Sequence, residues 1–336
     1  MEAVLVSMIT DAGSHWGPGH EIGHQHQQPF TLNGLTEVTN NLFSNVVLWY
    51  YGESTSRYNG SEGALSKVLE QFNTEGADFF SNNIWAQTVM YYKLFMYYHV
   101  LGHNPKFYPR LFEMLRQNPM SKGYEQSGVT TLMHFYKMCC EASGDDLTEF
   151  FRAHGFFEVM NQRLVGDYSN SVYTLTQEQI NTAIASVKQK GYPENIAVLF
   201  INDATGETIK SHKGDNLEFY GETAVCAEMG CYASFAEGEN SSAYTYAIDG
   251  TKVAVNGTGG VGLAIFNKQG ELVAFSDNKE FTVTTEVATL IATGEVEVKV
   301  LNADNTQVIA KDEMLYKNPA DVREDLGALL SKVAVL

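Results

Sequence analysis

The sequence predicts an α+β protein with two domains, a mainly helical region followed by an antiparallel β-sandwich. Apolar residues recur at helical spacing up to about residue 191, and after Gly191-Tyr192-Pro193 the chain changes to short β-prone runs separated by turn residues. With 336 residues and 44% hydrophobic content, the chain is long enough for two moderate cores. We therefore expect a helical domain at residues 1–192 and a β-sandwich at residues 193–336.

The helical region is divided by breakers such as Gly102-His103-Asn104-Pro105 and Asn118-Pro119. Pro18 suits the first turn of a helix, and the run from Thr174 to Gln179 has the pattern of a capped helix start. A short apolar run at residues 3–9 suits a strand. The expected helices cover residues 18–27, 33–50, 62–73, 80–100, 107–117, 124–142, 146–153 and 176–190.

The second region contains many short strands and one closing helix that starts near Ala320. Within it, Gly257 to Gly262 matches the glycine pattern of dinucleotide-binding proteins, G-x-G-x-x-G. That pattern must lead into a helix to bind a pyrophosphate, whereas here it leads into strands, so we interpret it as a glycine-rich hairpin or bulge. The expected strands are residues 196–201, 243–248, 252–255, 262–266, 272–275, 280–284, 287–291 and 295–301.

Charge and composition exclude several classes of partner. The net charge of −18 argues against nucleic acid and anionic membranes, and no apolar stretch reaches the about 18–20 residues that a membrane helix needs. The first residues do not form a signal peptide, so we expect that the signal of an exported protein would lie upstream of this chain.

The four cysteines provide no C-x-x-C pair, which leaves a cysteine zinc site unsupported. We interpret Cys139, Cys140, Cys226 and Cys231 as free, mostly buried thiols. A bridge between Cys226 and Cys231 remains possible where the backbone allows it.

The stretch His20-Glu21-Ile22-Gly23-His24 carries the clearest chemistry. It is an H-E-x-x-H pattern, in which two histidines bind zinc and the glutamate acts as general base. Residues four apart on a helix are offset by only about 40°, so both imidazoles project from one face. The sequence therefore predicts a zinc site with His20 and His24 as ligands and Glu21 as the catalytic base.

A hydrolytic zinc site needs a third protein ligand and an open position for water. The first carboxylate after the motif is Glu37, and Gly34 lets the chain turn so that a second helix brings Glu37 against the first. We expect Glu37 to be the third metal ligand. A purely structural zinc site is disfavoured because such sites prefer four protein ligands and cysteine.

Several other residues near the motif have alternative interpretations. His26 lies about 200° around the helix from His24, so we interpret it as a surface residue or an outer-shell histidine. Asn41 is either a hydrogen-bonding partner that orients a ligand histidine or simply a polar helix residue. A donor to the reaction's oxyanion is also expected. His103, Tyr124, His134 and Tyr136 are candidates, and the sequence does not choose among them.

The run from Trp16 to Gln27, followed by Gly34 to Asn41, resembles the enhancin-like family of zinc metallopeptidases. Viral enhancins and bacterial enzymes that attack mucins and other O-glycoproteins belong to that family. The resemblance implies a gluzincin site with His20, His24 and Glu37 as ligands and Glu21 as base. It covers residues 14–50, and only nineteen residues precede His20, so we expect this chain to be part of a longer protein.

The resemblance implies a zinc-dependent endopeptidase that cuts mucin-like or other O-glycosylated proteins outside the cell or at its surface. The alternative is a fragment that keeps the zinc site and binds glycoprotein or glycan without cutting. The intact Glu21 favours the first hypothesis, and the short stretch before the motif favours the second. The sequence leaves the oligomeric state open.

Overall fold

The structure is a computed structural model that describes residues 15–51, 71–100, 103–167, 169–200, 235–237, 245–256, 262–276 and 280–303. Several expectations lie outside these residues. They are the strand at residues 3–9, most of the helix at 62–73, Cys226 and Cys231, nearly all of the glycine-rich stretch at 257–262, and the helix from Ala320.

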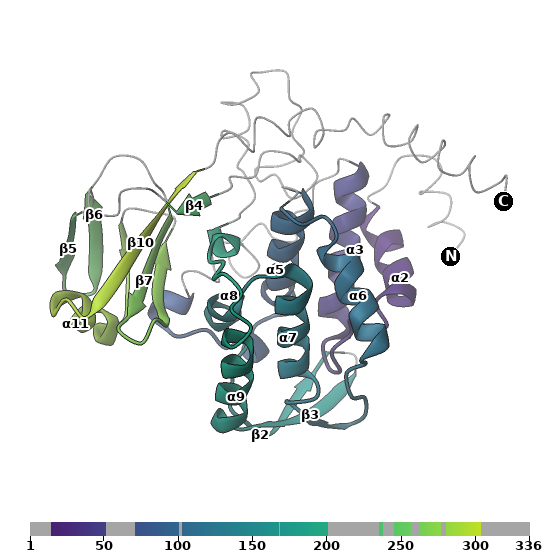
Figure 1. The fold of residues 1–336 in the computed structure, drawn as a ribbon. Coiled ribbons are helices and arrows are strands. Elements are labelled where there is room, and N and C mark those ends of the chain that lie inside the picture. The colour runs from purple at the N-terminus through teal and green to yellow at the C-terminus, as the bar shows by residue number, and fades with distance from the viewer. Residues whose placement is uncertain are drawn as a thin grey trace.

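Helices dominate the first half of the chain (Figure 1). Helix α2 packs on α3, α3 packs on α5, and α6 packs on α7. The helices are α2 (Trp16–His26), α3 (Thr36–Tyr51), α5 (Ile84–Phe95), α6 (Phe107–Gln117), α7 (Leu132–Ser143), α8 (Thr148–Ala153) and α9 (Gln177–Lys188), joined by the 3-10 helices η2 (Phe79–Ser81) and η4 (Ala197–Phe200). Helix α5 continues directly into a π-helix, η3 (Met96–Val100).

Helix α5 lies inside this core, since every residue from Ala86 to Phe95 is buried. Asn83 caps it, accepting hydrogen bonds from the backbone nitrogens of Trp85 and Ala86. Tyr91, Tyr92 and Tyr98 are fully buried, so the aromatic stripe is core and these tyrosines do not line a cleft. The capped start at Thr176 is confirmed as well, since its hydroxyl and Gln179 form a capping box.

A small sheet in the helical half was not expected from the sequence. It consists of β1 (Glu125–Ser127), β2 (Met160–Gly166) and β3 (Asn170–Leu175) in the order β1-β3-β2, with β1 parallel and β2 antiparallel to β3. The helix predicted for residues 124–142 begins only at Leu132, because its first residues form β1 and a turn. A bulge near Gln162, which has a φ of 51°, interrupts the alternation of β2.

The described part of the second half is antiparallel, as expected. One sheet has the order β4-β10-β7-β8 and the other β5-β6-β9. Two predicted strands are wrong, since residues 196–201 contain the 3-10 helix η4 and residues 287–291 lie in a helix, α11 (Thr285–Ala292). The strands are β4 (Phe235–Glu237), β5 (Thr245–Asp249), β6 (Lys252–Asn256), β7 (Gly262–Asn267), β8 (Leu272–Ser276), β9 (Glu280–Thr282) and β10 (Val296–Ala303).

The two sheets are small, and they do not confirm the predicted sandwich. Val253 of β6, Ile265 of β7 and Ile291 of α11 share a second core. Phe266 and Phe275 belong instead to the core of the helical half, so the β7–β8 hairpin packs on the helices. The division of the chain at residue 192 stays a prediction.

Cys139 and Cys140 are free and buried in α7, as predicted. Burial raises the pKa of both thiols, which therefore stay protonated and inert. None of the described helices has the length and apolar content that a membrane span requires.

Two glycines with left-handed backbones, Gly144 at the end of α7 and Gly155 just after α8, give a matched test of packing. Gly155 has a φ of 71°, and a Cβ there would overlap the Ala77 carbonyl group, whereas Gly144 has a φ of 81° and open space around it. Gly144→Ala is expected to cost about 1–2 kcal/mol of unfolding free energy, from backbone strain alone. Gly155→Ala should cost about 1–3 kcal/mol more, because the backbone must shift. Urea unfolding measures the free energy of unfolding of both variants. Equal losses of stability would show that the backbone at Ala77 moves aside at no cost.

Candidate metal centre

Three side chains from two neighbouring helices converge at one point. His20 and His24 lie one turn apart on α2, with ring centroids 4.8 Å apart. Glu37, in the first turn of α3, faces both histidines: its Oε2 lies 2.9 Å from His20 Nε2, and its Oε1 lies 3.5 Å from His24 Nε2. All three ligand atoms are within 4.8 Å of one another.

Glycines allow α2 to approach α3 closely enough for this convergence. A Cβ at Gly23 would overlap the side-chain oxygen of Asn40, and a Cβ at Gly19 would lie 3.0 Å from Val47. Asn40 also donates a hydrogen bond from Nδ2 to the His20 carbonyl at 2.8 Å. Gly19 and Gly23 have the same four-residue spacing as the histidines, so one face of α2 packs on α3 while the adjacent face presents the imidazoles.

The donor set fits a zinc ion. Two imidazole nitrogens and one carboxylate are ligands that Zn²⁺ accepts in hydrolytic sites, where water takes the remaining position. The side chains of His20, His24 and Glu37 are 19%, 27% and 13% exposed, so the site is partly buried and open to solvent on one side. Among the described residues, no other group of three histidines, cysteines and carboxylates has this arrangement.

Glu21 lies beside the ligand set on the same helix. Its position is rotated by about 100° from His20 and about 60° from His24. The residue is exposed and is not one of the three converging side chains. Glu21 is thus an exposed residue next to the ligand face of α2, and hydrolysis needs a proton-accepting group near that face.

A hydrogen-bond relay that the sequence analysis missed supports His24. The side-chain amide of Gln27 lies 2.8 Å from His24 Nδ1, and the Thr39 hydroxyl lies 2.7 Å from the other end of that amide. If His24 binds metal through Nε2, then Nδ1 carries the proton and needs an acceptor. In the structure the amide nitrogen of Gln27 faces His24 and the amide oxygen accepts from the Thr39 hydroxyl. For metal binding we assign the reverse orientation, with the oxygen towards His24 and the NH₂ towards Thr39, whose hydroxyl then donates to the Leu35 carbonyl. The sequence contains a signal for this contact, since Gln27 lies three residues after His24 and residues at that spacing are neighbours on a helix.

Gln27→Leu is expected to weaken zinc binding by about 10–100-fold, the usual cost of losing a group that orients a ligand histidine. Gln27→Glu should retain or increase the affinity, because a carboxylate accepts the same hydrogen bond more strongly. Chelator competition measures the effect. Gln28→Leu is the matched control, since Gln28 is exposed and its side chain donates to the His24 carbonyl rather than to the His24 ring. Equal affinities for Gln27→Leu and Gln28→Leu would exclude the relay.

The other residues discussed near the motif have clear positions. His26 is exposed at the end of α2, away from the three ligands. Pro18 lies in the first turn of α2, as expected. Asn41 is buried and donates to the Thr88 hydroxyl at 3.5 Å, which joins α3 to α5. The hypothesis that Asn41 orients a ligand histidine is therefore wrong, and Gln27 has that position.

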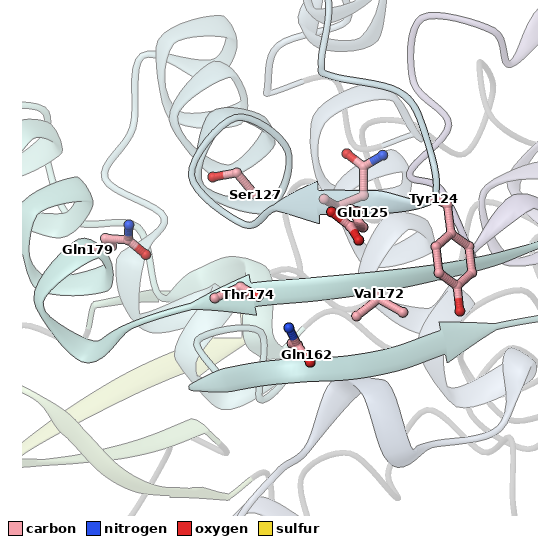
Figure 2. Close-up of a pocket in the computed structure, with 8 residues that line it drawn as sticks. Tyr124, Glu125, Ser127, Gln162, Val172, Thr174 and Gln179 are labelled. Carbon is pink, nitrogen blue, oxygen red and sulfur yellow. The ribbon is translucent and has the colours of Figure 1, made fainter.

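Three of the four candidate oxyanion donors contact structural partners. His103 stacks on a tyrosine ring, the His134 ring hydrogen bonds to a backbone carbonyl, and the Tyr136 hydroxyl pairs with a buried threonine. Tyr124 is 60% exposed and lines an open polar groove on the β1-β3-β2 sheet together with Gln162 (Figure 2). The oxyanion role therefore remains unassigned.

The peptidase M60 family model, described as enhancin and enhancin-like, matches residues 3–155. This part of the chain is similar to the enhancin-like peptidases. The matched residues include all three converging side chains and Glu21, and the resemblance inferred from the sequence is confirmed. No protein of curated function matches the chain.

Two solved metallopeptidase structures share the fold of this chain. One, from Bacteroides thetaiotaomicron, is 25% identical with a TM-score of 0.62, over 86% of this chain and 48% of its own length. The other, a metallopeptidase in complex with Tn antigen, is 23% identical with a TM-score of 0.63, over 87% and 54%. The chain thus spans about half the length of each. Family and fold together support a metallopeptidase.

Proposed function

We propose that this chain is a zinc-dependent endopeptidase that hydrolyses peptide bonds in mucin-like or other O-glycosylated proteins. The observation that carries the proposal is the convergence of His20, His24 and Glu37, with Glu21 free of the ligand set beside them. Two neutral donors and one carboxylate leave a bound zinc ion with net positive charge and a free position.

Each residue has a defined part in hydrolysis. His20, His24 and Glu37 would hold the ion, and Gln27, with its amide oxygen towards Nδ1, would keep the His24 ring in the tautomer that offers Nε2. Zinc, when bound, supplies a Lewis acid that polarises a carbonyl group and makes water more acidic. Glu21 accepts the proton of the attacking water and then donates it to the leaving amine nitrogen.

The substrate class rests on the family resemblance and on the solved metallopeptidase that shares this fold and contains Tn antigen. Glycoproteins of the mucin type are the proposed substrates, and we propose an extracellular or cell-surface location for the enzyme. The acidic net charge of −18 is compatible with neutral glycans and disfavours polyanionic partners.

The proposal is tested with one mucin in two forms, carrying its O-glycans or enzymatically stripped of them. The zinc-loaded chain and its Glu21→Gln variant are incubated with each form, and the products are read by mass spectrometry. We expect cuts only by the parent chain and only in the glycosylated form.

Other outcomes separate the hypotheses. Equal cleavage of both mucin forms would support the endopeptidase and contradict the glycan requirement. No cleavage, with one zinc ion bound per chain, would contradict the endopeptidase. Binding of the glycosylated form would then support the non-cleaving alternative.

A further inference from the structure

The turn between β2 and β3 reaches the first turn of α3, the helix that carries Glu37. The Glu37 backbone nitrogen donates a 2.6 Å hydrogen bond to Oδ2 of Asp167. The other carboxylate oxygen of Asp167 accepts from the Ser169 backbone nitrogen at 3.2 Å. One carboxylate therefore links the turn to the backbone of a candidate metal ligand.

Ser169 makes a second set of contacts with the segment that leads into α3. Its hydroxyl accepts from the Gly34 backbone nitrogen at 3.3 Å and pairs with the Thr36 hydroxyl at 3.1 Å. The same segment is held by the sheet, because the Tyr173 hydroxyl donates to the Asn33 carbonyl at 2.7 Å. The entry to α3 is thus attached to β3 and to the turn before it.

Helix α3 lacks a cap of its own. Leu35 is the N-cap residue, since its carbonyl accepts the first helical hydrogen bond from Thr39, but a leucine side chain offers no acceptor. Asp167 supplies that acceptor from a distant part of the sequence. Its negative charge also lies at the positive end of the helix dipole.

Gly34 fixes how closely the segment and the sheet approach. Its φ is 81°, and a Cβ there would overlap the Val165 carbonyl oxygen of β2. Only glycine combines this backbone conformation with this contact. The spacing between β2 and the start of α3 is therefore set by backbone packing at Gly34 as well as by the side chains of Asp167 and Ser169.

We propose that Asp167 is a positioning residue for the metal site, which sets the Glu37 carboxylate against His20 and His24. The proposal rests on the assignment of Glu37 as a zinc ligand. The Glu37 carboxylate lies 2.9 Å from the His20 imidazole and 3.5 Å from the His24 imidazole. A shift of the Glu37 backbone would change these distances and so disturb the arrangement of the three side chains. Asp167 lies beyond residue 155, where the family match ends, so the metal site depends on a part of the chain outside that match.

The test compares zinc affinity and stability in Asp167→Ala, Asp167→Asn and Asp78→Ala. Asp78 is the matched control, because it also caps a helical turn, accepting from the Phe80 backbone nitrogen at 3.0 Å, but it is not linked to a metal ligand. Chelator competition gives the zinc dissociation constant, urea unfolding of the metal-free proteins gives stability, and visible absorption of the cobalt-loaded proteins reports ligand geometry.

Asp167→Ala is expected to weaken zinc binding by about 10–100-fold and to shift the cobalt spectrum. Asp167→Asn should restore most of the affinity, since its amide oxygen still accepts from Glu37. Asp78→Ala should lower stability and leave the zinc affinity at the parent value. If Asp167→Ala does not fold, Ser169→Ala takes its place and is expected to weaken zinc binding for the same reason.

Parent affinity and an unchanged cobalt spectrum in a folded Asp167→Ala or Ser169→Ala would overturn the positioning role. Glu37→Ala in the same series separates this failure from failure of the proposed function. Zinc retained by Glu37→Ala would remove the ligand assignment itself. Zinc lost by Glu37→Ala but kept by Asp167→Ala would remove the positioning role alone.

Discussion

Replacing Glu21 with glutamine is expected to lower kcat for peptide hydrolysis by about 10²–10⁴-fold, the usual contribution of a general base. Glutamine has nearly the same shape as glutamate but does not accept a proton from water. Zinc content should stay at the parent value, because Glu21 is not among the three converging side chains. Steady-state kinetics on an O-glycosylated peptide substrate, with metal analysis of the same samples, checks both parts.

His26→Ala is the control for Glu21→Gln. His26 is on the same helix and is exposed at its end, away from the ligands. We expect this variant to keep both kcat and zinc. If Glu21→Gln retained parent activity in a preparation free of other peptidases, the proposed mechanism would be wrong.

Removing the Glu37 carboxylate is expected to have the largest effect on zinc retention. Glu37→Ala takes away one of three protein ligands and the only negative charge among them. The loss of affinity should exceed the about 10–100-fold typical of losing an outer-shell partner. Glu37→Gln keeps one oxygen donor without the charge, so an intermediate affinity is expected. Dialysis followed by metal analysis measures the retention.

Asn41→Ala provides a comparison for Glu37→Ala one turn further along α3. Asn41 contacts Thr88 of α5 and no ligand, so its removal should reduce stability and leave zinc bound. Undiminished zinc in Glu37→Ala after dialysis would exclude Glu37 from the site. Zinc loss in Asn41→Ala would mean that general loosening of α3 explains both results.

The convergence of His20, His24 and Glu37 could be predicted because local geometry determines it. Two histidines four apart must share a helix face, and a glycine-led second helix was enough to place Glu37 near them. The contact between Gln27 and His24 also has a local cause, since the two residues are three positions apart at the end of α2. Asp167 had no such signal. Its contact with Glu37 joins residues 130 positions apart, and only the tertiary structure brings them together.

The strand errors have physical causes too. In β2 the bulge at Gln162 breaks the alternation of buried and exposed residues that identifies a strand. Residues 287–291 are apolar except for Thr289, and some are β-branched, which suggested a strand. However, Val287, Ala288 and Ile291 are buried at helical spacing, and the Thr284 hydroxyl caps the helix by accepting from the Val287 nitrogen. A five-residue window is too short to distinguish these periods.

The β7–β8 hairpin has a consequence for cooperative unfolding. Asn73 exchanges two hydrogen bonds with the Phe275 backbone, at 2.7 and 3.0 Å, and the buried Glu149 carboxylate accepts from the Leu272 nitrogen at 2.9 Å. A chain ending at residue 192 would leave both buried groups short of partners and expose the apolar surface that Phe275 covers. The helical half and this hairpin should therefore lose protection from amide hydrogen exchange in a single transition, as one folding unit that extends at least to residue 276.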